Sequence, residues 1–156
     1  MQTLPSIAVL GAGSMAGAIV RGLIAAGTDP ASVTVTTRSE SSAEAWRGDG
    51  VRATALESDP DANSAAVRGA GIVLLGVKPA MVPDTLRQTA GALDPDALVV
   101  SVAAGVTTAT MESLVPNAVV RTMPNTPALV GRAVTGVAAG SRAGEVGRAS
   151  CRERVY

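Results

Sequence analysis

A glycine-rich turn near the start of the chain is the segment whose residue types point most directly to chemistry. Residues 11–16 read Gly-Ala-Gly-Ser-Met-Ala, which matches G-x-G-x-x-G/A, and they directly follow the apolar run Ile7–Leu10. Gly11 permits a tight turn, Gly13 lets a phosphate approach the backbone, and Ala16 lets the following helix pack closely on a sheet. Unpaired N–H groups at the start of that helix attract a pyrophosphate. The segment therefore predicts dinucleotide binding, with a purely structural turn as the alternative.

The end of the second predicted strand is the position that discriminates between dinucleotides. NAD-selective sites usually carry an acidic residue about twenty positions after the glycine turn. Here the sequence reads Thr36-Thr37-Arg38-Ser39, and the first carboxylate is that of Glu40. An arginine flanked by hydroxyl groups suits a 2′-phosphate. The sequence therefore favours NADP(H) over NAD(H), with a solvated surface side chain as the alternative role for Arg38.

Three later segments place polar or small residues where strands are predicted to end. Lys78, the only lysine of the chain, follows an apolar run, residues 101–106 read Ser-Val-Ala-Ala-Gly-Val, and residues 121–127 read Arg-Thr-Met-Pro-Asn-Thr-Pro. In an open parallel sheet the carboxyl ends of the strands face the ligand crevice. These segments are therefore candidate walls of the same site. The alternatives are a snorkelling surface lysine, a plain turn and a linker.

The composition excludes several classes of site. The chain has 156 residues, 13 basic and 13 acidic side chains, no histidine and one cysteine. These counts exclude a histidine general base, a Ser-His-Asp triad, a zinc site with histidine ligands, an internal disulfide and a four-cysteine metal site. Zero net charge and only one Trp and one Tyr argue against nucleic-acid binding. We expect neither a metal nor a nucleic acid.

Membrane attachment and export are not indicated by the sequence. The longest apolar runs are far too short to span a bilayer, and the first six residues lead directly into a strand-like run instead of a signal peptide. We therefore expect a cytoplasmic protein without membrane contact. Cys151 is interpreted as a free surface thiol, because no partner base accompanies it.

The pattern of apolar residues predicts the elements that position these segments. Short runs rich in Val, Ile and Leu are typical of buried strands, and stretches with helical spacing lie between them. The predicted strands are Ile7–Leu10, Val33–Thr36, Ile72–Leu75, Leu98–Val100, a run from Val119 and Ala133–Ala139. The predicted helices cover residues 15–24, 40–47, 61–68, 82–90 and 107–114. This alternation predicts an α/β fold, a Rossmann-like, doubly wound and mainly parallel sheet with helices on both faces.

The last residues of the chain do not share this pattern. From Gly140 onward there is no apolar periodicity, and arginine is frequent. We therefore expect residues 1–140 to form a dinucleotide-binding domain and residues 141–156 to be an atypical, disordered tail.

Four segments together carry a resemblance to a known family. They are Ile7–Ala18 (IAVLGAGSMAGA), Gly76–Pro79 (GVKP), Ser101–Val106 (SVAAGV) and Arg121–Ala128 (RTMPNTPA). In this order and spacing, residues 5–140 resemble the N-terminal dinucleotide-binding domain of pyrroline-5-carboxylate reductase. The resemblance implies reduction of 1-pyrroline-5-carboxylate to L-proline, the last step of proline biosynthesis. The implied cofactor is NADPH, with NADH as the alternative, and the family forms homo-oligomers.

The resemblance also implies which positions contact the cofactor. In chain order, the matching positions correspond to the family's pyrophosphate loop, its contacts to the ribose or 2′-phosphate, an adenosine-side contact, its contacts to the inner ribose and the surroundings of the nicotinamide. These positions are Leu10, Gly11, Ala12, Gly13, Ser14, Met15, Thr37, Arg38, Ser39, Asn63, Val77, Lys78, Pro79, Val102, Ala103, Ala104, Met123, Pro124 and Asn125. No catalytic residue is assigned, and the nearest candidates are Lys78 and Asn125.

One departure from the family bears on activity. The family continues into a helical second domain that builds the dimer and holds the substrate, and the sequence is expected to lack it. Whether this chain turns over substrate by itself therefore stays open. Two alternatives also stay open: another NADP-dependent dehydrogenase or imine reductase of the same fold, and a nucleotide-binding module without catalysis.

Overall fold

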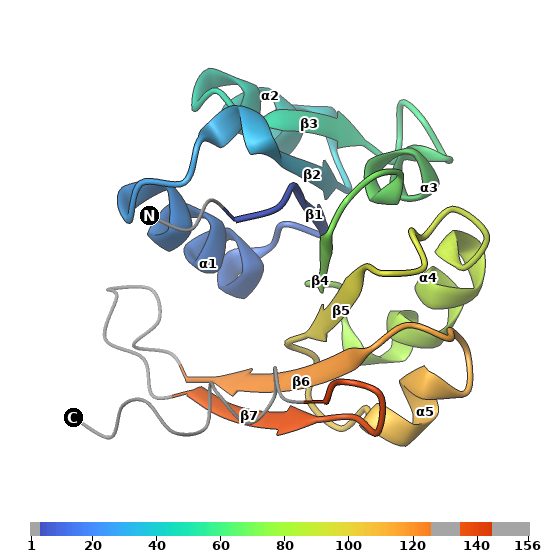
Figure 1. Cartoon of the computed structure of the whole chain (residues 1–156). Helices are drawn as coiled ribbons and strands as arrows, with labels where there is room; N and C mark the ends of the chain where they lie inside the picture. The colour runs from blue at the N-terminus through green and yellow to red at the C-terminus, as the bar shows by residue number, and fades with distance from the viewer. Residues whose placement is uncertain (1–3, 126–134, 145–156) are drawn as a thin grey trace.

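The structure is a computed structural model that describes residues 4–125 and 135–144. Within these residues, seven strands form one sheet in the order β3-β2-β1-β4-β5-β6-β7 (Figure 1). The strands are β1 (Ile7–Leu10), β2 (Val33–Thr37), β3 (Arg52–Ala55), β4 (Ile72–Leu75), β5 (Leu98–Ser101), β6 (Val119–Pro124) and β7 (Thr135–Ala139). The α-helices are α1 (Ser14–Ala25), α2 (Glu40–Gly48), α3 (Ala62–Val67), α4 (Val82–Thr89) and α5 (Thr108–Glu112).

The connections make this a doubly wound sheet. Neighbouring strands are parallel except β6 and β7, which are antiparallel. The chain adds β2 and β3 on one side of β1, then returns to place β4 on the other side. The loops that follow β1 and β4 therefore diverge at the carboxyl edge of the sheet, where ligands bind in folds of this kind. The Rossmann-like fold predicted from the sequence is confirmed.

Apolar side chains of the central strands pack on both faces of the sheet. Because successive strand residues point to opposite faces, Ala8 and Leu10 belong to one core cluster and Ile7 and Val9 to the other. The first cluster includes residues of α3, α4 and α5, and the second includes residues of α1 and α2. All five predicted helices are present. They cover the two faces of the sheet, so the loops at the strand ends are the parts left to form a site.

Two parts of the sheet differ from the expectation. β3 has no counterpart among the predicted strands, because its sequence, Arg-Ala-Thr-Ala, lacks the run of Val, Ile or Leu by which buried strands are found. Residues 121–127 are predicted to lie where a strand ends, but Arg121–Pro124 continue β6 and pair with β7. Polar types are tolerated there because β7 is mostly exposed. Thr126 and Pro127 lie outside the described residues.

The first residues of the predicted tail are bound to α5. The Ser141 hydroxyl donates to both Glu112 carboxylate oxygens at 3.1 Å, the Arg142 guanidinium donates to the Val115 carbonyl at 3.1 Å, and Ala143 is only 4% exposed. Partial burial raises the pKa of Glu112, but the hydrogen bonds from Ser141 and Arg142 outweigh this effect and lower the pKa below its ordinary 4.5. The prediction of a disordered tail is therefore wrong for residues 141–143. Residues 145–156, with Cys151, lie outside the described residues.

None of the helices in the described parts of the chain is both long and apolar enough to cross a membrane.

Gly76, directly after β4, tests how closely the two diverging loops pack. A Cβ added there would lie 2.4 Å from the Gly11 carbonyl oxygen and 2.5 Å from the Ala16 Cβ. Gly76→Ala should therefore lower the free energy of unfolding, measured in urea, by about 1–3 kcal/mol, since neither neighbour can rotate away. Gly22→Ala in α1 is the control, because a Cβ added there meets nothing within 4 Å. It should stabilise the chain by about 0.5–1 kcal/mol, and equal effects of the two substitutions would contradict the packing argument.

Candidate functional site

The glycine turn lies between β1 and α1, at the carboxyl edge of the sheet. Gly11 has φ +81°, and its N–H donates to the Thr36 hydroxyl at 3.1 Å. The next N–H, of Ala12, donates to the Thr36 carbonyl at 2.9 Å. A Cβ added at Gly11 would lie 2.8 Å from Val77 Cγ1. Backbone conformation and close contact therefore both require glycine at this position.

The start of α1 is open beside this turn. Gly13 is the N-cap of α1, and no side chain caps the helix. Gly13 and Ser14 are exposed, and a Cβ added at Gly13 would meet nothing within 4 Å. The first N–H groups of a helix have no partner within the helix and carry its positive end. The structure thus has the open space and the free donors that a phosphate group needs here.

The turn between β2 and α2 carries an arginine, Arg38, and β2 is the neighbour of β1, which the glycine turn follows. The Thr37 hydroxyl donates to the Ser39 carbonyl at 2.9 Å, and the Ser39 hydroxyl caps α2 by accepting from the Ser42 N–H at 3.4 Å. Arg38 between them is exposed, and its guanidinium has no hydrogen bond or ion pair within residues 4–125 and 135–144. The cation is therefore available to an external anion.

The ends of β4 and β5 come to the same edge. The register pairs Leu10 with Leu75 and Leu75 with Ser101, so these three strands end side by side. The Gly76 N–H donates to the Leu10 carbonyl at 2.8 Å, and the Val102 N–H donates to the Leu75 carbonyl at 3.3 Å. Beyond these bonds, the residues Lys78, Pro79 and Ala104 are exposed, Val77 and Val102 are half-buried and Ala103 is buried. The register therefore brings the predicted contacts of β1, β4 and β5 together.

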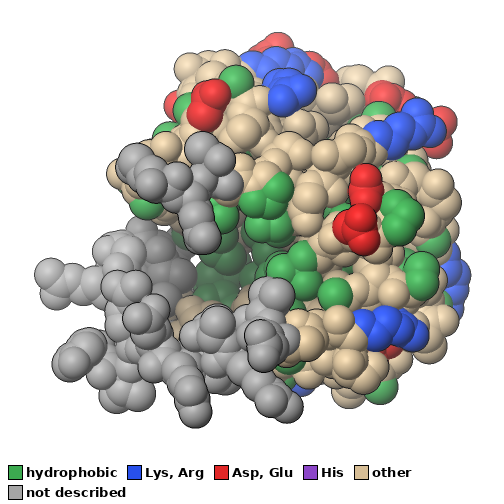
Figure 2. Space-filling view, viewed as in Figure 1, with side chains coloured by type: hydrophobic (Ala, Val, Ile, Leu, Met, Phe, Trp, Pro, Cys, Tyr) green, Lys and Arg blue, Asp and Glu red, His purple; other side chains and the backbone are tan. Residues whose placement is uncertain are grey.

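The third wall is formed by the end of β6 and the residue after it. Met123 and Pro124 belong to the strand and extend it beyond the end of β5, because Ser101 pairs with Arg121. Met123 is 41% exposed, and Asn125 is also exposed. The candidates Lys78 and Asn125 follow β4 and β6, which β5 separates. Figure 2 shows a hollow near the middle of the face viewed, with apolar side chains along the part of its border that the described residues form.

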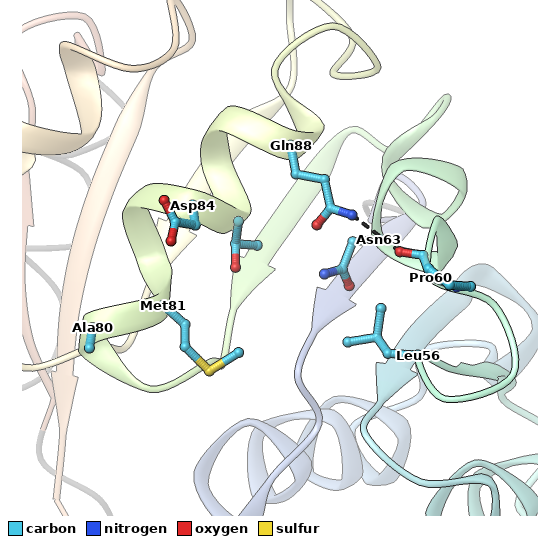
Figure 3. Close-up of a pocket in the computed structure, with 8 residues that line it drawn as sticks. Leu56, Pro60, Asn63, Ala80, Met81, Asp84 and Gln88 are labelled. Atoms are coloured by element: carbon cyan, nitrogen blue, oxygen red, sulfur yellow. Dashed lines mark hydrogen bonds between the residues drawn. The ribbon is translucent and has the colours of Figure 1, made fainter.

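Asn63 lies on α3, behind the end of β2. It is 4% exposed, and its Oδ1 accepts a hydrogen bond from the Thr36 hydroxyl at 2.7 Å. It borders a cavity of about 250 Å³ between the loop after β3, α3 and α4 (Figure 3). The cavity is lined by Leu56, Pro60, Asn63, Ala80, Met81, Asp84, Thr85 and Gln88. Sequence reasoning missed Thr36 and the α4 residues, because polar residues on a strand or on the outer side of an amphipathic helix look like solvated ones.

Comparison with protein families shows the family to which the chain belongs. Residues 6–105 match the family described as NADP oxidoreductase, coenzyme F420-dependent. The chain belongs to this family. The match covers the glycine turn, the β2–α2 turn, Asn63 and the ends of β4 and β5. The third wall, at the end of β6, lies beyond the matched residues.

Individual relatives of this NADP oxidoreductase domain are pyrroline-5-carboxylate reductases. The chain is 39% identical to that of Corynebacterium melassecola over 142 residues, which are 88% of this chain and 51% of the relative. It is 35% identical to that of Pseudomonas aeruginosa over 97% of this chain and 54% of the relative.

A solved structure gives the same relation. The pyrroline-5-carboxylate reductase from Coxiella burnetii superposes with a TM-score of 0.85 at 33% identity, over 96% of this chain and 54% of that one. The chain therefore spans about half the length of the relatives that it matches. The resemblance found in the sequence is confirmed.

The β2–α2 turn is stabilised by a carboxylate whose ionisation can be tested. Hydrogen bonds from Arg47 and Ser58 lower the pKa of Glu40 below its ordinary 4.5. A lowered pKa stabilises the folded chain above pH 4.5, and this stability is lost as the pH falls through the folded-state pKa. Glu40→Gln should therefore reduce the free energy of unfolding around neutral pH, and the difference from the wild type should shrink in acid. Urea unfolding across the pH range measures it, with exposed Glu44→Gln of the same helix as the control; a difference that grows in acid would contradict the assignment.

Proposed function

We propose that this domain binds NADP(H) and serves the reduction of 1-pyrroline-5-carboxylate to L-proline. The observation that carries the proposal is the glycine turn at the point where the loops of the sheet diverge, with open space at Gly13 and an uncapped α1. The likeness to pyrroline-5-carboxylate reductases supports the choice of substrate, because it extends beyond the turn to the segments after β4, β5 and β6.

The residues fit the cofactor at each part of its length. Space at Gly13 and the free donors of α1 suit the pyrophosphate, and exposed Arg38 with Thr37 and Ser39 suits a 2′-phosphate. Asn63 would meet the adenosine side. We assign the inner ribose to Val77, Lys78 and Pro79, and the nicotinamide to Val102, Ala103, Ala104, Met123, Pro124 and Asn125. Together with Leu10, Gly11, Ala12, Ser14 and Met15, these residues form the proposed cofactor site.

For this reaction, the main task of the chain is to orient the cofactor and the substrate, and proton transfer by its side chains is less important. When bound, the reduced nicotinamide supplies the hydride that the imine carbon accepts. A protonated imine is already electrophilic, so positioning contributes most of what the protein must provide. Small residues after β5 leave room for a flat ring beside the backbone, and the exposed Met123 side chain offers an apolar wall. A domain without histidine can fulfil this role.

The extent and setting of the domain belong to the same proposal. We assign residues 1–140 to the cofactor domain, because the seven strands found in the described residues lie between Ile7 and Ala139. A cytoplasmic location follows from the proposed cofactor, which is a metabolite of the cell interior. We also propose that the active enzyme is a homo-oligomer that binds no nucleic acid.

Calorimetric titration of the purified chain with NADPH tests the glycine turn. Gly13→Ala should keep wild-type stability, since its extended backbone suits alanine and the added Cβ has open space, yet weaken NADPH binding by about tenfold or more because the methyl group occupies the place of the phosphate. Equal affinity of the two proteins would place the pyrophosphate elsewhere.

Adding 1-pyrroline-5-carboxylate to the NADPH-loaded chain tests the reaction. Substrate-dependent NADPH oxidation supports the proposed reaction, and binding without oxidation restricts the chain to holding the cofactor.

Cofactor choice is tested at the β2–α2 turn. Arg38→Asp should weaken NADPH binding by about tenfold or more, because it removes the cation opposite the 2′-phosphate, and should change NADH binding little. Arg68→Asp, at another exposed arginine just after α3, makes the same change of charge and is the control. Equal losses for both cofactors in Arg38→Asp would remove the 2′-phosphate role.

A further inference from the structure

A single buried hydroxyl connects the glycine turn with Asn63. Thr36 is fully buried near the end of β2, and its oxygen accepts from the Gly11 N–H at 3.1 Å. The same hydroxyl donates its proton to Asn63 Oδ1 at 2.7 Å. Gly11 lies 25 residues before Thr36, and Asn63 lies 27 residues after it. The hydroxyl therefore joins two segments that only the fold brings together.

The direction of these bonds determines which atom Asn63 presents. A hydroxyl has one proton, and the backbone N–H of Gly11 can only donate, so the Thr36 proton needs an acceptor. Asn63 Oδ1 is that acceptor, which leaves Nδ2 on the opposite side of the amide. Figure 3 shows the Asn63 nitrogen on the side of the cavity between α3 and α4. No described residue accepts a hydrogen bond from Nδ2, and Asn63 as a whole is only 4% exposed.

We propose that Thr36 is a positioning residue, which holds the glycine turn and at the same time turns the Asn63 Nδ2 donor towards the adenosine half of the cofactor. The identity of this ligand rests on the proposed function. The group recognised is an acceptor of the adenosine moiety, a ribose or phosphate oxygen or a ring nitrogen. Thr36 itself is buried and acts through Asn63 and the Gly11 backbone.

Removal of the hydroxyl should affect both partners together. In Thr36→Val, which keeps the shape, the partly buried Gly11 N–H and the buried Asn63 Oδ1 both lose their partner. The amide of Asn63 then has no reason to prefer one orientation, so the donor faces the cavity for only part of the time. Thr36→Ser keeps the hydroxyl and should keep both bonds. If Thr36 acted only through packing, loss of its methyl group in Thr36→Ser would instead disturb the glycine turn and Asn63.

NMR of the chain without nucleotide tests the connection itself. The Gly11 amide should exchange with solvent more slowly in the wild type and Thr36→Ser than in Thr36→Val, and the chemical shifts of the Asn63 side-chain amide should change only in Thr36→Val. Equal exchange in all three would overturn the proposal. This readout needs no ligand, so it decides on Thr36 even if the wild type binds neither NADPH nor NADH, a result that would instead refute the proposed function.

Titration with 2′,5′-ADP and NADPH tests the consequence for binding. Thr36→Val should weaken both by about tenfold, the value of one hydrogen bond, and Thr36→Ser should restore binding to within about twofold. In the Asn63→Ala background, Thr36→Val should have a smaller effect, because the residue through which it acts is gone. Equal effects in both backgrounds, or no rescue by serine, would overturn the role of Thr36.

Asn63→Asp tests the donor without changing Thr36. The aspartate keeps an oxygen for the Thr36 hydroxyl but replaces Nδ2 with an acceptor. The Gly11 amide should therefore exchange as in the wild type, whereas 2′,5′-ADP binding should fall by about tenfold or more. Wild-type affinity in this variant would overturn the assignment of Nδ2, and the comparison holds even if Thr36→Val does not fold.

Discussion

The close approach of two backbone segments, the turn after β1 and the residue after β4, is the constraint on which the rest of the site depends. β1 and β4 are parallel neighbours in register, so their ends meet at the same edge. The Gly11 carbonyl and Ala16 leave no room for a side chain at Gly76, and Val77 leaves none at Gly11. Two strand ends with ordinary side chains could not come this close. The turn then leads into α1 with its first N–H groups facing open space at Gly13.

Much of this arrangement could be predicted from the sequence because it has a local signature. The glycine turn is recognisable since each small residue answers a steric need at a fixed offset, and the runs at β1, β4 and β5 are apolar because both faces of the sheet are covered. Parallel pairing then brings Leu10, Leu75 and Ser101 to one edge without further information. For the same reason, the walls after β4 and β5 could be assigned from their place at strand ends.

Other features could not be predicted because they depend on partners distant in the chain. Nothing in the run Val-Thr-Val-Thr-Thr marks Thr36 as different from Thr34, since the distinction arises only where α3 brings Asn63 to one face of β2. β3 has no apolar run of its own and is a strand because β2 offers an edge to pair with. Likewise, the Met-Pro segment after Arg121 looks like a loop until β7 pairs with it.

The carboxylates around the β2–α2 turn bear on the choice between NADP(H) and NAD(H). Glu40 follows Arg38 by two residues, so a count along the sequence could assign it to the ribose hydroxyls. In the structure, however, its carboxylate accepts from Arg47 and Ser58, and Glu57 accepts from the Glu40 backbone N–H at 2.8 Å. Both carboxylates are thus engaged in the junction between β3 and α2, whereas the Arg38 guanidinium is exposed and has no partner in the described residues. The Arg38 cation lies between two hydroxyl-bearing residues, and it is therefore the group that we propose to bind the 2′-phosphate.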